Sequence, residues 1–305
     1  IYTLSLHDAL PIYAPSLGSV HQPRTRDPAR AESVSPAASD PLPRFPMTTP
    51  PLPRRTFTVD CLAVRVHATQ SHLAADAADA VTRYLKEVLE ARPQAAAILA
   101  SATSQIQFLD ALAKRPEVDW SRVILFHMDE YLGIAADHPA SFRRFMRERV
   151  ESRLHPRAFH FIGGDCLEPL AECDRYAALL RAQPIDLCCL GIGENGHVAF
   201  NDPPVADLND PRLVKLVKLD EPCRRQQVGE GCFPTIESVP QYAFSLTVPA
   251  LCAARKMVCV VPERRKAHAV RQTLRGPIST ACPASILRRQ PHATLFLDAE
   301  SAAEV

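Results

Sequence analysis

From about residue 57 onward, short aliphatic or β-branched runs alternate with longer segments of helical period. Short apolar runs predict buried strands, and they occupy residues 62–66, 96–100, 123–128, 159–162, 186–191, 243–247, 256–261 and 294–297. Residues 71–90 and 104–114 place their apolar side chains on one helix face each, so both predict helices that cover a sheet. This alternation predicts an α/β fold with a mostly parallel sheet.

Residues 202–239 interrupt the alternation with charged and proline clusters and little period. Long segments of this kind are often lids or binding loops, so we expect an excursion over the surface here. No linker rich in proline or glycine divides residues 57–300. We therefore expect a single domain over that range.

The first 56 residues have a different character. Eleven of the 28 prolines fall within residues 1–53, without any hydrophobic period, which predicts a disordered leader over residues 13–56. Residues 1–12 (IYTLSLHDALPI) resemble the in-frame translation of a sequencing adaptor, so we expect them to be an artefact. Met47 then becomes a plausible start of translation. The alternatives are a genuine disordered tail or an organelle transit peptide.

Composition excludes several classes of protein. The 305 residues carry 35 Lys+Arg and 34 Asp+Glu, a net charge of +1, which speaks against nucleic-acid binding. No apolar run is long enough to span a membrane, so we expect a soluble protein. The ten cysteines include no C-x-x-C pair, so neither a zinc site nor a disulfide framework is indicated. Most lie within apolar runs, which favours a reducing, cytoplasmic compartment.

The first candidate for chemistry is a glycine cluster behind a predicted strand. The chain has only ten glycines, yet Gly191, Gly193 and Gly196 fall within six residues, directly before His197. Glycine allows the backbone to approach a ligand closely, and α/β folds bind ligands at the carboxyl ends of parallel strands. The alternative to a ligand site is a tight turn with solvated polar residues. The imidazole of His197 beside the glycines speaks against this alternative.

A second polar loop follows the predicted strand 123–128. Asp129 and Glu130 are adjacent carboxylates, which are costly behind a buried strand unless they are solvated or used. In a doubly wound sheet they open into the same crevice as His197. A carboxylate and an imidazole in one cavity can abstract and donate protons. The alternative is that Asp129 caps the segment that follows it.

A third loop suggests a phosphate site. Ser101, Ala102, Thr103 and Ser104 follow a predicted strand and open a helix, so hydroxyl and backbone N–H groups are available to an anion. Lys266, with two arginines before it, follows another strand and could complete the site. Each feature alone has a common explanation, since Ser and Thr are favoured helix caps and basic clusters are usually solvated.

Together, FHMDEYLG at residues 126–133 and LGIGENGHVAFNDP at residues 190–203 resemble the two signature segments of the glucosamine-6-phosphate deaminase/isomerase family. The resemblance extends over about residues 60–300, in the same order. It implies a Rossmann-like, modified doubly wound sheet. It also implies conversion of an aminosugar 6-phosphate to fructose 6-phosphate and ammonia, without a metal or an organic cofactor. The implied partner is a small sugar phosphate, and a homo-oligomer is possible.

The resemblance also assigns roles to residues. His197 matches the histidine that opens the sugar ring, and Asp129 matches the base that moves the C2 proton to C1. Asp202 stands where the family has a glutamate that orients the histidine, and Asn195 stands where well-known deaminases have an aspartate. Substrate and phosphate binding is assigned to the remaining matching positions, which are Ser101, Ala102, Thr103, Ser104, Glu130, Gly193, Gly196 and Lys266.

Several departures indicate a divergent branch. Ala102 and Thr103 replace glycines that are usual in the phosphate loop, and the family's phosphate-binding arginine has no clear match around residues 229–233. Arg224 or Arg225 could substitute for it. Two rival functions therefore stay open: a 6-phosphogluconolactonase, which shares the fold, and a sugar-phosphate sensor without turnover. A sensor that regulates transcription would need a DNA-reading helix pair, for which the sequence gives no support.

Overall fold

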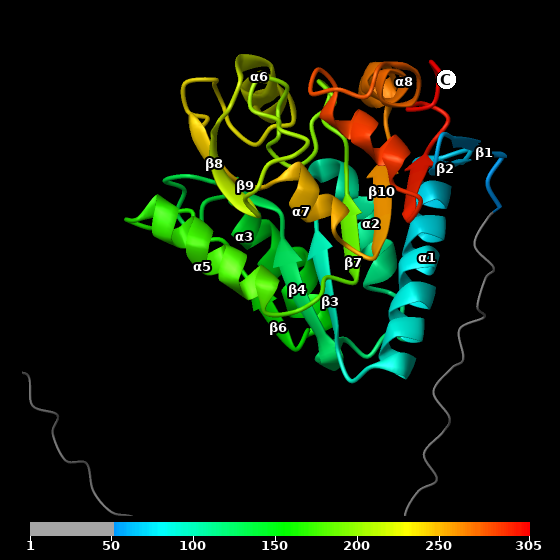
Figure 1. Cartoon of the computed structure of the whole chain (residues 1–305), viewed down its shortest axis with the longest axis horizontal. Helices are drawn as coiled ribbons and strands as arrows, with labels where there is room; N and C mark the ends of the chain where they lie inside the picture. Colours follow the sequence, from blue (N-terminus) through cyan, green and yellow to red (C-terminus); the bar gives the residue numbers. More distant parts are fainter. Residues whose placement is uncertain (1–51) are drawn as a thin grey trace, which may run out of the picture. The chain divides into compact units, whose positions relative to one another are not determined.

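The centre of the fold is a large, mostly parallel sheet (Figure 1). A computed structural model describes residues 52–305, and within them this sheet has eight strands. Their order is β1 (Arg55–Val59), β2 (Leu62–Val66), β11 (Ala293–Leu297), β10 (Lys256–Val261), β7 (Leu187–Leu190), β3 (Ala95–Leu99), β4 (Val123–His127) and β6 (Ala158–His160). β1 and β2 are antiparallel, and all other neighbours are parallel. The predicted α/β class with a mostly parallel sheet is confirmed.

Both faces of this sheet are buried because its strands contribute to two apolar cores. On β7, Cys188 belongs to one core and Cys189 to the other. The second core contains the apolar faces of α1 (Gln70–Ala91) and α2 (Ile106–Leu112), whereas the first contains those of α5 (Pro169–Arg181), α7 (Val248–Cys252) and α8 (Ala267–Arg275). Burial on both faces explains the unbroken apolar runs of the central strands.

A second, smaller sheet was not predicted. It contains β5 (Asp129–Tyr131), β9 (Tyr242–Leu246) and β8 (Val214–Lys218), all paired antiparallel. Asp129 lies opposite Ser245 in this sheet, so the first candidate carboxylate sits on a strand rather than in a free loop. Apolar residues of this sheet and of α6 (Glu221–Gly229) form a third core cluster.

The remaining helical segments are short. They are α3 (Phe142–Met146), α4 (Ser152–Leu154), the 3-10 segments Thr103–Gln105, Trp120–Arg122, Arg264–Lys266 and Pro283–Arg289, and the π segment Arg147–Glu151. The predicted helix 104–114 thus begins as a 3-10 turn and continues as α2. The predicted helix 71–90 agrees with α1, whose first turn is capped by the Thr69 hydroxyl, which accepts a hydrogen bond from the backbone N–H of His72.

Three sequence expectations need correction. Residues 202–239 are not a structureless excursion, because they contain β8 and α6. The predicted boundary between leader and domain at residue 57 is too late, because β1 begins at Arg55. The predicted end at residue 300 is too early, since Ser301 and Ala302 are buried.

The adaptor-like residues 1–12 and most of the predicted leader lie outside the described residues. Within residues 52–305, no helix has the length and apolar character needed to cross a membrane.

Candidate active site

One pocket lies where β3, β4, β7 and β10 end. Parallel strands direct their carboxyl ends to the same edge of a sheet, so the segments that follow them meet there. The pocket lining brings together most of the residues proposed from sequence, namely Ser101, Ala102, Thr103, Ser104, Asp129, Gly193, His197 and Lys266. Asp129 and His197 line one pocket, as expected for a shared crevice, and the loop of residues 101–104 and Lys266 line it as well.

His197 is held by the carboxylate of Asp202. Its Nδ1 lies 2.7 Å from Oδ1 of Asp202, which is fully buried. The Asn195 side chain contacts both residues. Its Nδ2 donates to Oδ1 of Asp202 at 2.9 Å, and its own Oδ1 accepts from the backbone N–H of His197 at 3.0 Å. Burial raises the pKa of Asp202, but the bonds from His197 and Asn195 outweigh this effect and bring it below its usual value. Nδ1 is thereby engaged, which leaves Nε2 for a substrate.

Glycine at position 193 is required by the histidine ring. A Cβ atom on Gly193 would lie 2.2 Å from Cε1 and Nε2 of His197, so the ring packs directly on this backbone. Gly196 adopts a φ of +85°, and a Cβ there would lie 2.6 Å from Sγ of Cys282. Ala199 also has a positive φ, of 48°, although it carries a side chain. The glycine cluster thus shapes the turn that presents His197.

Cys223 is a neighbour of this pair that the sequence did not reveal. Its Sγ, a ring nitrogen of His197 and a carboxylate oxygen of Asp202 lie within 4.8 Å of one another. Burial raises the pKa of the Cys223 thiol, and the nearby Asp202 carboxylate raises it further. A hydrogen bond from the thiol helps to lower the pKa of Asp202.

Asp129 lines the same pocket with an unsatisfied carboxylate. Within the described part of the chain, its Oδ1 is buried and has no hydrogen-bond partner. Burial raises the pKa of Asp129 well above its usual value, and the adjacent Glu130 adds to the shift. A buried carboxylate with a raised pKa and a free oxygen is suited to act as a general base.

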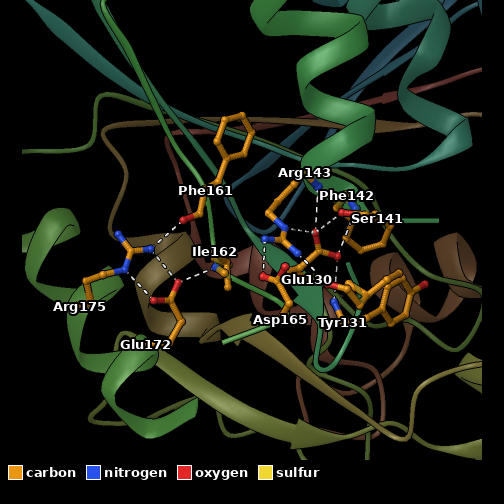
Figure 2. Close-up of polar contacts among 12 residues, drawn as sticks. Glu130, Tyr131, Ser141, Phe142, Arg143, Phe161, Ile162, Asp165, Glu172 and Arg175 are labelled. Atoms are coloured by element: carbon orange, nitrogen blue, oxygen red, sulfur yellow. Dashed lines mark hydrogen bonds and ion pairs between the residues drawn. The ribbon is translucent and has the colours of Figure 1, made fainter. Parts of the chain in front are cut away.

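Glu130 has a different environment, although it is the next residue (Figure 2). Its carboxylate accepts hydrogen bonds from the Ser141 hydroxyl at 2.8 Å and from the backbone N–H groups of Tyr131, Phe142 and Arg143 at 3.0, 3.1 and 2.9 Å. It does not line the pocket. The structure therefore places Glu130 at the start of α3 as a cap, and not with the groups that a substrate could contact.

Lys266, Ser101 and Ser104 also line this pocket. Lys266 is buried, and no carboxylate of residues 52–305 lies within 4.0 Å of its ammonium group. Burial lowers its pKa. The Ser101 hydroxyl is buried and without a partner in the same part of the chain. Two polar groups that lack protein partners and face one cavity are expected where an anion binds.

A model of the family described as glucosamine-6-phosphate isomerases/6-phosphogluconolactonase matches residues 68–296. The chain belongs to this family. Among curated members, the glucosamine-6-phosphate deaminase of Listeria innocua is 34% identical over 188 residues, covering 62% of this chain and 78% of the relative. That of Exiguobacterium sibiricum is 33% identical over 219 residues, covering 72% and 84%.

Solved structures of the family share the fold. A monomeric glucosamine-6-phosphate deaminase superposes with a TM-score of 0.72 and 27% identity, covering 79% of this chain and 99% of that one. A 6-phosphogluconolactonase from Shewanella baltica has a TM-score of 0.65 at 21% identity, covering 79% and 97%, which supports the fold alone.

Several pocket residues of this family member escaped the sequence analysis. The segment before α3 and α3 itself contribute Pro139, Ala140, Ser141, Phe142 and Phe145, and α6 and the segment after it contribute Gln226, Gln227, Glu230 and Cys232. A long polar segment gave no periodic signal to indicate which of its residues turn inward. The suggested substitutes for the missing arginine do not line the pocket: Arg224 donates to backbone carbonyls at Ile236 and Val239, and Arg225 pairs with Glu221.

Proposed function

We propose that this protein is a glucosamine-6-phosphate deaminase that forms fructose 6-phosphate and ammonia. The observation that carries the proposal is the placement of Asp129, with its free buried oxygen, in one pocket with His197 and Lys266. A base, an imidazole and a buried cation are the groups that such a reaction on a sugar phosphate needs. The curated relatives at 33–34% identity carry the same name.

The phosphate would bind at the end formed by Lys266, Ser101 and Ser104. A buried ammonium group interacts with a phosphate dianion in a medium of low dielectric constant, where the attraction is stronger than in water. Serine hydroxyls and backbone N–H groups of the loop can donate hydrogen bonds to the phosphate oxygens. Fixing the phosphate at this end positions the sugar ring between Asp129 and His197.

His197 would open the sugar ring. Asp202 and Asn195 fix its ring orientation through Nδ1 and the backbone, so Nε2 can carry a proton to the ring oxygen. Breaking the bond between C1 and the ring oxygen, with transfer of the C1 hydroxyl proton to solvent water, gives the open-chain aldehyde. The ionised Asp202 stabilises the imidazole when it holds the extra proton.

Asp129 would then carry out the isomerisation. Its carboxylate removes the proton at C2, which gives an enolamine, and returns that proton to C1, which leaves an imine at C2. Addition of water to the imine and departure of ammonia yield the ketone of fructose 6-phosphate. The raised pKa of Asp129 makes it a stronger base than an exposed carboxylate.

The rival lactonase function needs an activated water molecule but no base at C2. His197, with its nitrogen fixed by Asp202, could activate water as well. The free, buried carboxylate oxygen of Asp129 has no role in that reaction, which favours the deaminase. We further propose cytoplasmic location, which the ten free cysteines support. A homo-oligomer stays a prediction.

The test is to measure ammonia and fructose 6-phosphate formed from glucosamine 6-phosphate by the purified full-length protein. We expect equal amounts of both products, and a loss of about 10²-fold or more in kcat for His197→Ala, since general acid–base groups contribute on this order. His72→Ala is the matched control because His72 is exposed at the start of α1. Hydrolysis of 6-phosphogluconolactone, together with no release of ammonia from glucosamine 6-phosphate, would contradict the proposal.

A further inference from the structure

A carboxylate lies at the end of the pocket where an anion is expected. Glu230, which follows α6, lines the pocket, and its side chain is only 5% exposed. One oxygen accepts from the Thr103 hydroxyl of the phosphate loop at 3.2 Å. The other accepts from Nε2 of Gln226 at 2.8 Å and from Nη1 of Arg265 at 3.1 Å. An acidic group bonded directly to the phosphate loop would repel a phosphate ester.

Arg265 is the cation that compensates this carboxylate. Besides Glu230, its guanidinium contacts Glu263, with 2.5 Å between Nε and Oε2, and Glu194 at 3.5 Å. Glu263 has a φ of +82°, a strained backbone conformation for a residue with a side chain. Glu263 and Glu194 are about one-third or more exposed, whereas Glu230 is not, so Glu230 depends most on the arginine.

Arg265 acts from outside the pocket. It is not among the lining residues, although the next residue, Lys266, is. The Arg265 guanidinium therefore contacts Glu230 without lining the cavity, and Lys266 is the cation that lines it. The bonds from Arg265 and Gln226 hold one carboxylate oxygen, while Thr103 holds the other.

We propose that Arg265 is a positioning residue that cancels the charge of Glu230 and holds its carboxylate back, and that this pair sets the affinity of the pocket for phosphate monoesters. The inference rests on the proposed function, because it assumes that the phosphate binds beside Thr103 and Lys266. It assigns no direct contact between Arg265 and the substrate. This role differs from a direct contact with phosphate in one consequence: removal of Arg265 weakens phosphate binding only while Glu230 keeps its charge.

The experiment compares Arg265→Gln, Glu230→Gln and the double variant, with KM for glucosamine 6-phosphate and the dissociation constant of inorganic phosphate as readouts. For Arg265→Gln we expect both to rise about tenfold with little change in kcat, because an unpaired buried charge then faces the anion. The double variant should return to within about twofold of the wild type. Arg264→Gln is the matched control, since Arg264 is exposed and does not line the pocket.

The outcomes separate this inference from the proposed function. Equal effects of Arg265→Gln with and without Glu230→Gln would overturn the inference and indicate a direct contact between Arg265 and phosphate. Failure of the wild type to bind inorganic phosphate would also overturn it. If the wild type binds phosphate but releases no ammonia, the proposed reaction fails. The inference is still supported in that case if the double variant binds phosphate as tightly as the wild type does.

Discussion

Asp129 and Glu130 are adjacent acids on β5 that lie in opposite environments. Both are buried, but Oδ1 of Asp129 has no partner among residues 52–305 and its carboxylate lines a pocket. The Glu130 carboxylate accepts hydrogen bonds from four groups, and the Arg143 guanidinium lies 3.5 Å away (Figure 2). The alternation of side chains along a strand directs the two residues to different faces, which explains how neighbours acquire different roles.

The comparison teaches that burial alone does not identify a reactive acid. Burial raises the pKa of both groups, but only around Glu130 do backbone and hydroxyl donors oppose the rise. Arg143 also binds Asp165 at 2.8 Å, so the Glu130 centre continues as a network of paired charges. A satisfied carboxylate stabilises the fold, whereas an unsatisfied one lowers stability and is available to a substrate.

The largest expected effect comes from Asp129→Asn. We expect kcat for ammonia release to fall about 10³-fold, since an amide cannot accept the C2 proton. The melting temperature should rise by about 2 °C at pH 8, because the substitution removes a carboxylate that is buried without partners and destabilises the fold once it is ionised. The measurements are steady-state kinetics and thermal unfolding of the same samples.

The pH dependence provides the control for this variant. The raised pKa means that the folded state holds the Asp129 proton more firmly than the unfolded state does. The protonated side chain therefore contributes fully to stability below the pKa of the unfolded state. This contribution is lost as the pH rises through the pKa of the folded state. The gain in stability of Asp129→Asn should therefore be larger at pH 8 than at pH 4. Asp174→Asn, at an exposed site on α5, should show neither effect. Equal activity of Asp129→Asn and the wild type would refute the role of base.

The opposite result is expected for Glu130→Gln. The amide turns an NH₂ group toward backbone donors and leaves Arg143 with one fewer negative partner, which should cost about 3 kcal/mol of unfolding free energy. The melting temperature should fall by about 6 °C or more, while kcat of the folded enzyme changes little. Denaturant unfolding monitored by circular dichroism measures the change.

Glu148→Gln is the matched control for that measurement, because Glu148 pairs with Arg144 on an exposed helix surface. Surface ion pairs contribute about 0–1 kcal/mol, so its stability should hardly change. A normal melting temperature together with lost activity in Glu130→Gln would contradict the assignment of Glu130 as a cap.

The sequence could predict which loops meet but not which of two adjacent acids faces the cavity. The apolar runs that became β2 and β10 have unambiguous ends, so their bounds are as predicted. β8 carries lysines at Lys215 and Lys218 and lies among polar clusters, so its pattern was too weak to detect. The contact of Gly193 with the His197 ring depends on the exact path of the turn. Such close packing cannot be derived from residue type and spacing.

Gly193→Ala extends the comparison from charge to shape. A methyl group at this position would meet the His197 ring at 2.2 Å, so the ring must move away from its place beside Asp202. A displacement of about 1 Å in a catalytic group can cost about 10²-fold in rate, and we expect kcat to fall by that amount. Gly229→Ala is the control, since a Cβ there meets nothing within 4 Å. Retention of full activity in Gly193→Ala would show that His197 does not act from the position seen here.

Asn195→Asp gives the smallest expected effect and tests whether the pair of His197 and Asp202 tolerates another acid beside it. The substitution restores the residue expected from the family resemblance, but here the Asn195 amide donates to Asp202 at 2.9 Å. A carboxylate would instead face the ionised Asp202, and the two like charges would repel each other and loosen the hold on His197. We therefore expect kcat to fall about tenfold, in line with the 1–3 kcal/mol that a lost hydrogen bond to a charged group costs. Asn209→Asp, on an exposed turn, should leave kcat unchanged. An increase in kcat for Asn195→Asp would show that proton relay through position 195 matters more than the hydrogen bond to Asp202.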